Sequence, residues 1–204
     1  MDPFIGRRHI LCAIAKLLKV ATPVTLLGTP GVGKTRIARE FAAHFAGPVH
    51  WVSPRQGLDV ALSDANVDSL VVLDGVSTYG PGRSRTHELC SRSHVLVTGR
   101  DVSSLPREEV IPVPPLSPAK AAELVAHRLG EGLCPMHASR VLSVTDGLPG
   151  AIDLLARAHA RGVLDRALAR VEGGIFEVEA LQGRLTRTAR MSIVRRSLEA
   201  LQLS

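Results

Sequence analysis

Aromatic side chains are scarce in this sequence of 204 residues, which contains four Phe, one Trp and one Tyr. Such a chain lacks the several aromatic faces on which single-stranded nucleic acids stack, so aliphatic side chains must fill its core. No stretch approaches the roughly 18 consecutive apolar residues of a membrane-spanning helix. The N-terminus also lacks the apolar segment of an export signal. We therefore expect a cytoplasmic protein with no membrane partner.

Cysteine and lysine are sparse as well. Cys12, Cys90 and Cys134 lie far apart and without the spacing of metal ligands, which is typical of reduced thiols in a cytoplasm. The formal net charge is +6, yet only four of the 25 basic residues are lysine. The arginines are spread along the chain instead of forming a basic tail. Those near the C-terminus are expected to lie on a solvated helix face, with a partner or nucleic acid as the alternative; they are Arg184, Arg187, Arg190, Arg195 and Arg196. The charge therefore leaves nucleic acid open as a partner without establishing it.

Short apolar runs alternate with amphipathic segments up to about residue 115, which is typical of a wound α/β sheet. Continuous runs such as Leu70–Leu73 indicate strands that helices cover on both faces. The expected strands are Val24–Leu27, Val49–Val52, Leu70–Leu73, Val95–Thr98 and Val110–Val113. Trp51 and Val52, at the end of the second strand, are expected in the core and not in contact with a ligand. The expected helices are His9–Leu18, Lys34–Phe45, Leu58–Ala65 and Arg85–Ser91.

Only helices are expected after Pro112. Ser117 followed by Pro118 is typical of a helix N-cap with proline in the first position. We predict domains at residues 1–115 and 116–204. The expected helices of the second domain are Ala119–Leu129, Pro135–Thr145, Gly150–Ala160, Val163–Val171 and Thr188–Leu201, with breaks at Gly173–Gly174 and Gly183.

One segment matches the phosphate-binding motif G-x-x-x-x-G-K-[ST], between a buried strand and an amphipathic helix. In this motif the backbone N–H groups and the helix N-terminus face the phosphates. Lys34 is expected to reach the β- and γ-phosphates, and the Thr35 hydroxyl to bind Mg²⁺. The nucleotide-binding residues predicted here are Gly28, Thr29, Pro30, Gly31, Val32, Gly33, Lys34, Thr35 and Arg36.

Asp74 follows the buried run Leu70–Leu73 and is the expected second Mg²⁺ residue, acting through water. The strand Val49–Val52 falls between the motif and Asp74, an order that resembles P-loop ATPases with an extra strand between the two motif strands. Many such ATPases carry an acid after this Asp, but here the next residue is Gly75, and no acid follows until Glu88. We expect ATP hydrolysis to be slow or dependent on a partner.

Four further motifs resemble those of STAND NTPases, the signalling ATPases that include the NB-ARC, or AP-ATPase, family. In chain order they are Phe4-Ile5-Gly6-Arg7-Arg8, His94–Arg100, Val113-Pro114-Pro115-Leu116-Ser117 and Gly147-Leu148-Pro149-Gly150-Ala151-Ile152. The resemblance implies a P-loop NTPase three-layer sandwich with a mainly parallel five-stranded sheet, followed by a small helical lid domain. It also implies ATP or ADP with Mg²⁺ as cofactors.

The resemblance implies roles for single residues. Ile5, Gly6 and Arg7 would contact the base side of the nucleotide, Arg100 would sense the γ-phosphate, and Pro149 would pack near the adenine. The expected catalytic residues are then Lys34, Asp74 and Arg100. The chain departs from the family at Arg8, where a Glu is usual, and at Gly75.

The resemblance ends at a stretch similar to the entry into the family's winged-helix domain, so we expect either a fragment or a minimal switch. The leading hypothesis is an ATP/ADP-dependent switch that controls signalling or assembly through a protein partner or self-assembly. The alternative is an AAA+-like ATPase of the origin-recognition or DNA-remodelling type. A third hypothesis is an interaction or DNA-binding module with an inert nucleotide.

Overall fold

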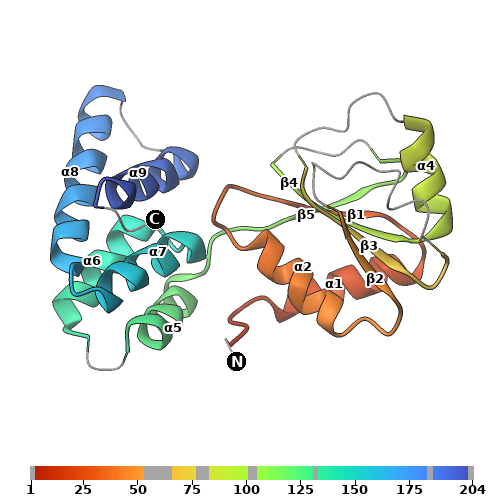
Figure 1. Ribbon diagram of the computed structural model, residues 1–204, viewed down its shortest axis with the longest axis horizontal. Coiled ribbons are helices and arrows are strands. Elements are labelled where there is room, and N and C mark those ends of the chain that lie inside the picture. Colours follow the sequence, from red (N-terminus) through yellow and green to blue (C-terminus); the bar gives the residue numbers. More distant parts are fainter. Residues whose placement is uncertain are drawn as a thin grey trace. The chain divides into compact units, whose positions relative to one another are not determined.

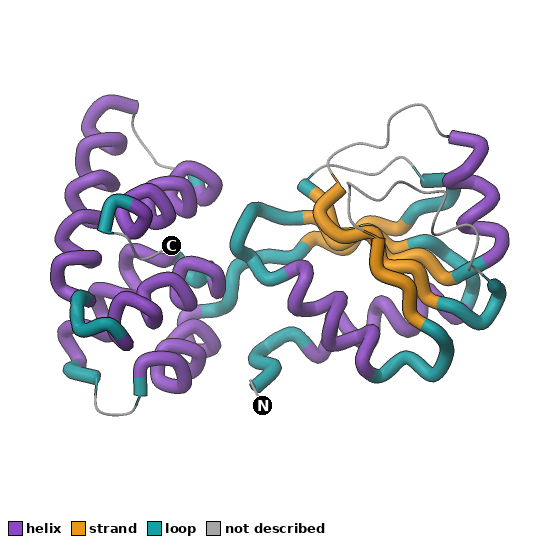
Figure 2. Tube along the Cα trace, viewed as in Figure 1, coloured by secondary structure: helices purple, strands orange, loops and turns teal. Residues whose placement is uncertain are grey.

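The computed structural model describes residues 3–52, 66–76, 83–100, 105–130, 133–182 and 186–201. The chain forms two compact units. The first comprises Met1–Gly28 and Lys34–Val113, and the second comprises Pro114–Ser204 together with Thr29–Gly33. Within the described residues the strands belong to the first unit, and the second is built from helices (Figure 1, Figure 2).

The first unit contains a five-stranded sheet in which each pair of neighbouring strands is parallel. The strands are β1 (Val24–Leu27), β2 (Val49–Val52), β3 (Leu70–Val76), β4 (His94–Gly99) and β5 (Glu109–Pro112). The α/β fold class and the parallel five-stranded sheet expected from the sequence are therefore confirmed. The limits of β1 and β2 are those predicted.

The strand order in the sheet is β2-β3-β4-β1-β5. One strand does separate the strand before the phosphate loop (β1) from the strand of Asp74 (β3), as in the P-loop ATPases with an added strand. That strand is β4, which comes later in the chain. The strand Val49–Val52 lies at the edge of the sheet instead, because order along the chain does not determine order in a parallel sheet.

Helices cover both faces of this sheet. They are α1 (Arg8–Lys19), α2 (Lys34–Ala43) and α4 (Arg83–Arg92). Val71 and Leu73 of β3 and Val95 and Val97 of β4 are buried in one cluster with Leu89 of α4. Because alternate residues of a strand face opposite sides, the remaining strand residues face α1 and α2, which lie across the sheet from α4 (Figure 1).

The second unit contains α5 (Pro118–Leu129), α6 (Pro135–Thr145), α7 (Pro149–Ala160), α8 (Leu164–Gln182) and α9 (Arg187–Glu199). Ser117 is the N-cap of α5, with Pro118 in the first turn as predicted. Arg140 of α6 donates two hydrogen bonds of 2.9 and 2.8 Å to Glu172 of α8. This forked ion pair links two helices that lie side by side in the unit.

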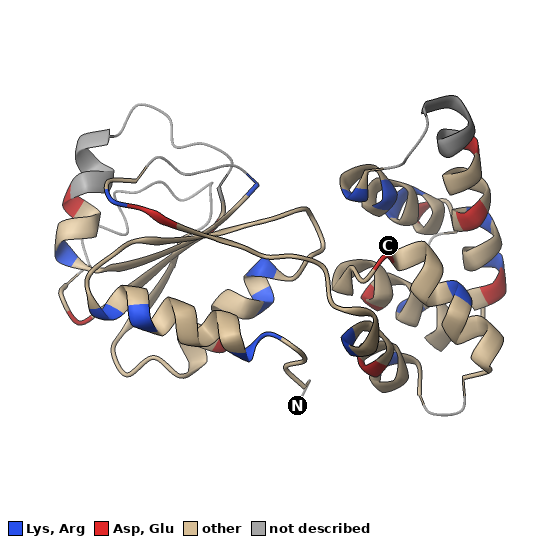
Figure 3. Cartoon of the chain, turned by 180° about the vertical axis from the view of Figure 1, so that it is seen from behind, with Lys and Arg blue, Asp and Glu red and all other residues tan. Residues whose placement is uncertain are grey.

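The basic residues of α9, visible in Figure 3, were expected to form a solvated helix face. Arg187 is exposed and pairs with Asp146 at 2.9 Å, and Arg190 donates to the backbone oxygen of Ser143 at 3.2 Å. Both contacts fasten α9 to the C-terminal part of α6. Arg195 and Arg196 are exposed, as expected.

Two expectations are wrong. The predicted break at Gly173–Gly174 is absent because α8 continues to Gln182, with Val171 and Ile175 buried on either side. Trp51 was expected in the core, but 39% of its surface is exposed. The predicted helix Leu58–Ala65 and the break at Gly183 lie outside the described residues. Among those residues, no helix has both the length and the apolar character needed to cross a membrane.

Candidate functional site

The carboxyl ends of three adjacent strands bring the predicted site residues of the first unit together. Leu27, the last residue of β1, is in register with Gly99 of β4, and Asp74 of β3 is in register with Thr98 of β4. In open parallel sheets, ligands bind beyond the carboxyl ends of the strands. The phosphate-loop motif begins directly after β1, and its last residue, Thr35, lies at this edge in contact with Asp74.

Asp74 accepts two hydrogen bonds on one carboxylate oxygen. The Thr35 hydroxyl donates to Asp74 Oδ1 at 2.8 Å, and the Thr98 hydroxyl donates to the same atom at 2.6 Å. Thr35 is the second residue of α2, whereas Thr98 is 1% exposed within β4. The two residues predicted to hold Mg²⁺, Thr35 and Asp74, are thus in direct contact. Hydroxyl and carboxylate oxygens are ligands that suit this hard cation.

Gly75 shapes the end of β3. Its φ angle is +76°, and the register between β3 and β4 is irregular from Asp74 to Val76. Side chains other than glycine rarely adopt this left-handed conformation without a cost. The turn lets the Gly75 N–H donate to the Thr98 hydroxyl at 2.9 Å. Thr98 therefore uses its oxygen twice, as acceptor from Gly75 and as donor to Asp74.

Lys34 is the first residue of α2 and is partly buried. Its Nζ donates to the backbone oxygen of Gly28 at 2.7 Å. Burial lowers the pKa of the Lys34 ammonium, and the charge of Arg100 lowers it further, whereas Asp74 raises it. Arg100, which directly follows β4, is exposed and close enough to act on Lys34 electrostatically. The charges of Arg100 and Asp74 thus both act on Lys34, the third predicted catalytic residue.

The glycines of the phosphate loop meet the requirements of a tight turn. Gly31 and Gly33 have φ angles of +77° and +101°. Within the second unit, the N–H of Gly150 donates to the oxygen of Gly31 at 2.8 Å. A Cβ on Gly150 would lie 2.8 Å from Gly31 Cα. The lack of a side chain at Gly150, which follows Pro149, thus permits this close approach.

Comparison with known proteins supports this description at the level of fold. Neither the protein-family models nor the curated proteins compared with the chain match it. Solved structures do match. The Walker-type ATPase PABY2304 of Pyrococcus abyssi superposes with a TM-score of 0.60 at 13% identity, covering 96% of this chain and 89% of that one.

Two further structures extend the comparison. The STAND protein PH0952 of Pyrococcus horikoshii, which has a tetratricopeptide repeat sensor, matches with a TM-score of 0.55 at 13% identity, covering 97% of this chain and 39% of its own. The Holliday junction branch migration motor RuvB of Thermotoga maritima matches with a TM-score of 0.51 at 17% identity, covering 97% of this chain and 70% of its own. The chain has the P-loop NTPase fold.

The segment before α1 contains Ile5, Gly6 and Arg7, the residues that the family resemblance implies as contacts of the base. Arg7 is 5% exposed, and its burial lowers the pKa of its guanidinium. The backbone oxygen of Arg7 accepts a hydrogen bond of 3.0 Å from the Ile10 N–H in the first turn of α1. Gly6 has a φ angle of +72°. The Arg36 guanidinium lies 5.9 Å from the ring centre of Phe4, so this segment lies against α2.

Pro149 occupies the first turn of α7 within the second unit, and its Cγ lies 3.8 Å from the place that a Cβ of Gly33 would take. The Leu116 N–H donates a hydrogen bond of 2.9 Å to the Gly147 oxygen. This bond joins the segment that contains Leu116 to the segment that contains Gly147 and Pro149, both of which resemble family motifs. A Cβ on Gly147 would lie 2.5 Å from Leu116 oxygen.

Sequence reasoning missed Thr98 as a site residue. Its signal was present, since a threonine at the end of a buried strand is a polar residue in an apolar run. Only the register of β4 against β3 places its hydroxyl beside Asp74. Glu88, the first acid along the chain after Asp74, does not join this group because it pairs with Arg92 on α4 at 3.1 Å. Within the described residues, no cluster of three His, Cys, Asp or Glu could hold another metal.

Proposed function

We propose that this chain binds ATP and ADP together with Mg²⁺ and acts as a STAND-type molecular switch. The observation that carries the proposal is the contact of Thr35, Asp74 and Thr98 beside Lys34 at the carboxyl ends of β1, β3 and β4. A hydroxyl, a carboxylate and a lysine after a phosphate loop are the groups that a nucleotide and its metal require.

Individual residues take defined tasks in this proposal. The backbone of the loop from Gly28 to Gly33 would hold the phosphates, and Lys34 would leave the Gly28 oxygen to contact them. Thr35 and Asp74 would hold Mg²⁺, which neutralises phosphate charge when it is bound. Thr98 would orient Asp74. Arg36, which follows the loop, lies against Phe4 and is thereby directed toward the N-terminal segment.

Slow hydrolysis forms part of the proposal. The backbone at Gly75 is left-handed, a conformation that an acidic side chain adopts only with strain. The usual neighbour of Asp74 that activates water is therefore missing for a structural reason. We expect turnover by the isolated chain below about one per second, under the range of ordinary enzymes. A partner could supply the absent group.

The switch itself requires that ATP and ADP make different contacts, because a ligand shifts an equilibrium only through differential affinity. Arg100 would report the γ-phosphate, and its electrostatic influence on Lys34 supports that assignment. Ile5, Gly6, Arg7 and Pro149 would contact the base. The hydrogen bond from Gly150 to the oxygen of Gly31 offers a route by which the loop could act on α7.

The test is to purify the chain without added nucleotide, denature it, and identify what is released. Retained ADP with turnover below one per second supports the switch. Lys34→Ala should weaken binding of fluorescent ADP at least 100-fold, whereas Lys16→Ala, on α1, should leave it unchanged. Unchanged affinity in Lys34→Ala would refute the phosphate-loop assignment.

The alternative is an AAA+-like ATPase that acts on DNA. The similarity of fold to the RuvB motor and the net charge of +6 support it. The two proposals predict different behaviour of the same sample. An empty site with hydrolysis that duplex DNA stimulates more than tenfold favours the alternative, and retained ADP that DNA leaves unaffected favours the switch.

A further inference from the structure

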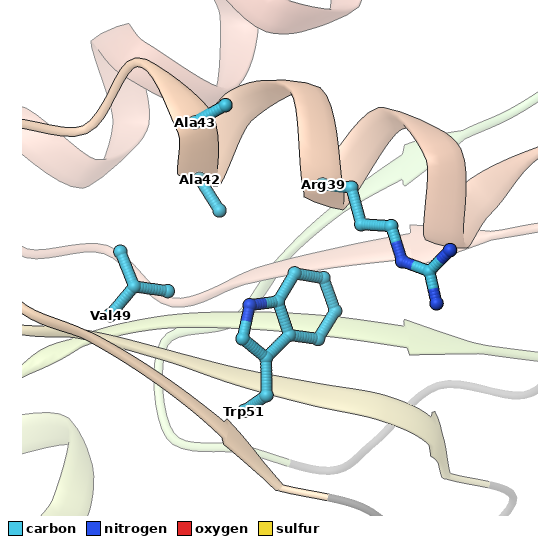
Figure 4. A pocket seen from close by; sticks show the side chains of 5 residues that line it. All are labelled: Arg39, Ala42, Ala43, Val49 and Trp51. Atoms are coloured by element: carbon cyan, nitrogen blue, oxygen red, sulfur yellow. The ribbon is translucent and has the colours of Figure 1, made fainter.

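A groove lies beside the edge of the sheet in the first unit, between α2 and β2 (Figure 4). Its volume is about 540 Å³, within the range of ordinary ligand sites. The residues that line it are Arg39, Ala42, Ala43, Val49 and Trp51. β3 and β4 separate β2 from β1 in the sheet, so the proposed nucleotide contacts do not account for this groove.

The floor of the groove is apolar and includes an exposed aromatic face. Val49 and Trp51 lie two residues apart and therefore face the same side of β2. Trp51 is the only tryptophan in the sequence, and 39% of its surface is exposed, whereas Val52 on the opposite side is 7% exposed. Ala42 and Ala43 of α2 lie above this floor (Figure 4). Their side chains are too short to cover the indole.

The rim of the groove carries one positive charge. Arg39 projects from α2 on the side of the indole (Figure 4) and is exposed. Arg36, one turn earlier, is paired with Glu40 at 3.2 Å. In the described part of the chain Arg39 has no such partner, and none of the described residues that line the groove is acidic. The guanidinium can therefore donate to a carboxylate that arrives with a ligand.

We propose that this groove binds an acidic peptide segment of a partner protein. An aromatic or branched aliphatic side chain of the segment would pack on Trp51 and Val49, and an adjacent carboxylate would pair with Arg39. Tryptophan and arginine are the residues that most often anchor protein interfaces. The net charge of +6 would attract an acidic partner and speed its association.

Two observations favour a peptide over a nucleic acid. The described residues of the groove offer one aromatic ring and one cation, whereas nucleic-acid surfaces combine several phosphate contacts with repeated stacking. In addition, β2 is hydrogen-bonded to β3 and to no second strand among the described residues. An edge strand can pair with an extended peptide through its backbone groups.

The experiment is a selection from a display library of random octapeptides on the full chain, with counter-selection on Trp51→Leu. Enriched sequences should carry Asp or Glu next to Phe, Tyr, Leu or Ile. The most enriched peptide is then synthesised with a fluorescent label and titrated by anisotropy, and it should also shift the emission of Trp51. Its affinity should fall at least tenfold in Arg39→Gln and in Trp51→Leu.

Lys19→Gln is the matched control, because it removes the same charge from an exposed position on α1 and should change the affinity less than twofold. Circular dichroism and ADP binding establish that the variants remain folded. Enrichment of basic or charge-neutral peptides would overturn the proposal, and so would equal affinity for Arg39→Gln and the parent chain. Binding of a 20-nucleotide single-stranded DNA that requires both Arg39 and Trp51 would replace it with a nucleic-acid surface. The peptide affinities do not depend on nucleotide binding, so a loss of ADP binding in Lys34→Ala should leave them unchanged.

Discussion

Replacing Thr98 by valine tests the hydrogen bonds that hold Asp74. The two side chains have nearly the same shape, but valine cannot accept from the Gly75 N–H at 2.9 Å or donate to Asp74 Oδ1 at 2.6 Å. Thr98 is 1% exposed, so water cannot replace its hydroxyl without rearrangement. A hydrogen bond to a charged group contributes about 2 kcal/mol. We expect Thr98→Val to lose about that much stability.

The stability change can be read from thermal unfolding. For a unit of this size, 2 kcal/mol corresponds to a decrease in the melting temperature of about 10 °C. The same 2 kcal/mol taken from Mg²⁺ binding corresponds to about 25-fold more Mg²⁺ for half-maximal ADP binding, because each 1.4 kcal/mol is a factor of ten. Binding of ADP in EDTA should change less than twofold, since Thr98 acts through Asp74 and not on the phosphates.

Thr98→Ser supplies the control. It retains the hydroxyl and removes one methyl group, so it should restore the Mg²⁺ dependence while losing about 1 kcal/mol of stability. A Thr98→Val protein that melts within 2 °C of the parent would refute the hydrogen-bond reasoning. If ADP binding in EDTA and in Mg²⁺ weakened equally, Thr98 would have a structural role only.

Shorter predictions concern three other sites, namely Lys34, Gly75 and the cysteines. Because the pKa of Lys34 is lowered, ADP affinity should fall as pH rises, beginning below the ordinary lysine value of 10.5; titrations from pH 7 to 10 check this. Between the lowered pKa of folded Lys34 and its ordinary value of 10.5, the unfolded nucleotide-free chain binds more protons at Lys34 than the folded chain does. The contribution of Lys34 to the free energy of unfolding should therefore rise with pH in this range. Gly75→Ala should cost about 1 to 2 kcal/mol in urea unfolding, through its positive φ alone, since open space surrounds the site. Burial, with a smaller effect of Glu108, raises the pKa of Cys90 to about 11, so at pH 8 thiol reagents should modify the exposed Cys12 and Cys134 well before Cys90.

The strands were predictable because apolar runs and their ends are local signals. Val24–Leu27 and Val49–Val52 have the limits that hydrophobicity indicates. The position of β4 between β1 and β3 was not predictable, because chain order places no constraint on which parallel strands become neighbours. The contact of Thr98 with Asp74 depends on that arrangement and on the register, so sequence reasoning identified Asp74 and missed the residue that orients it.

The two wrong expectations have separate physical causes. Glycine costs about 1 kcal/mol in a helix, and two in succession predicted a break at Gly173–Gly174. Burial of Val171 at 0% and Ile175 at 9% exposure offsets that cost, so packing overrides local propensity. Trp51 was assigned to the core because it is apolar. Its strand lies at the sheet edge, where the short side chains of α2 leave the indole uncovered.

Gly75 connects the local backbone to the expected slow hydrolysis. At this position the chain uses a left-handed residue so that its N–H reaches Thr98. Thr98 in turn donates to the carboxylate of Asp74. An acidic side chain at position 75 would have to adopt the same strained φ or abandon that hydrogen bond and with it the orientation of Asp74. The hydrogen-bonded arrangement of the Asp74 carboxylate and an acid directly after it therefore compete at this strand end. If a partner activates hydrolysis, the catalytic base has to come from outside the end of β3.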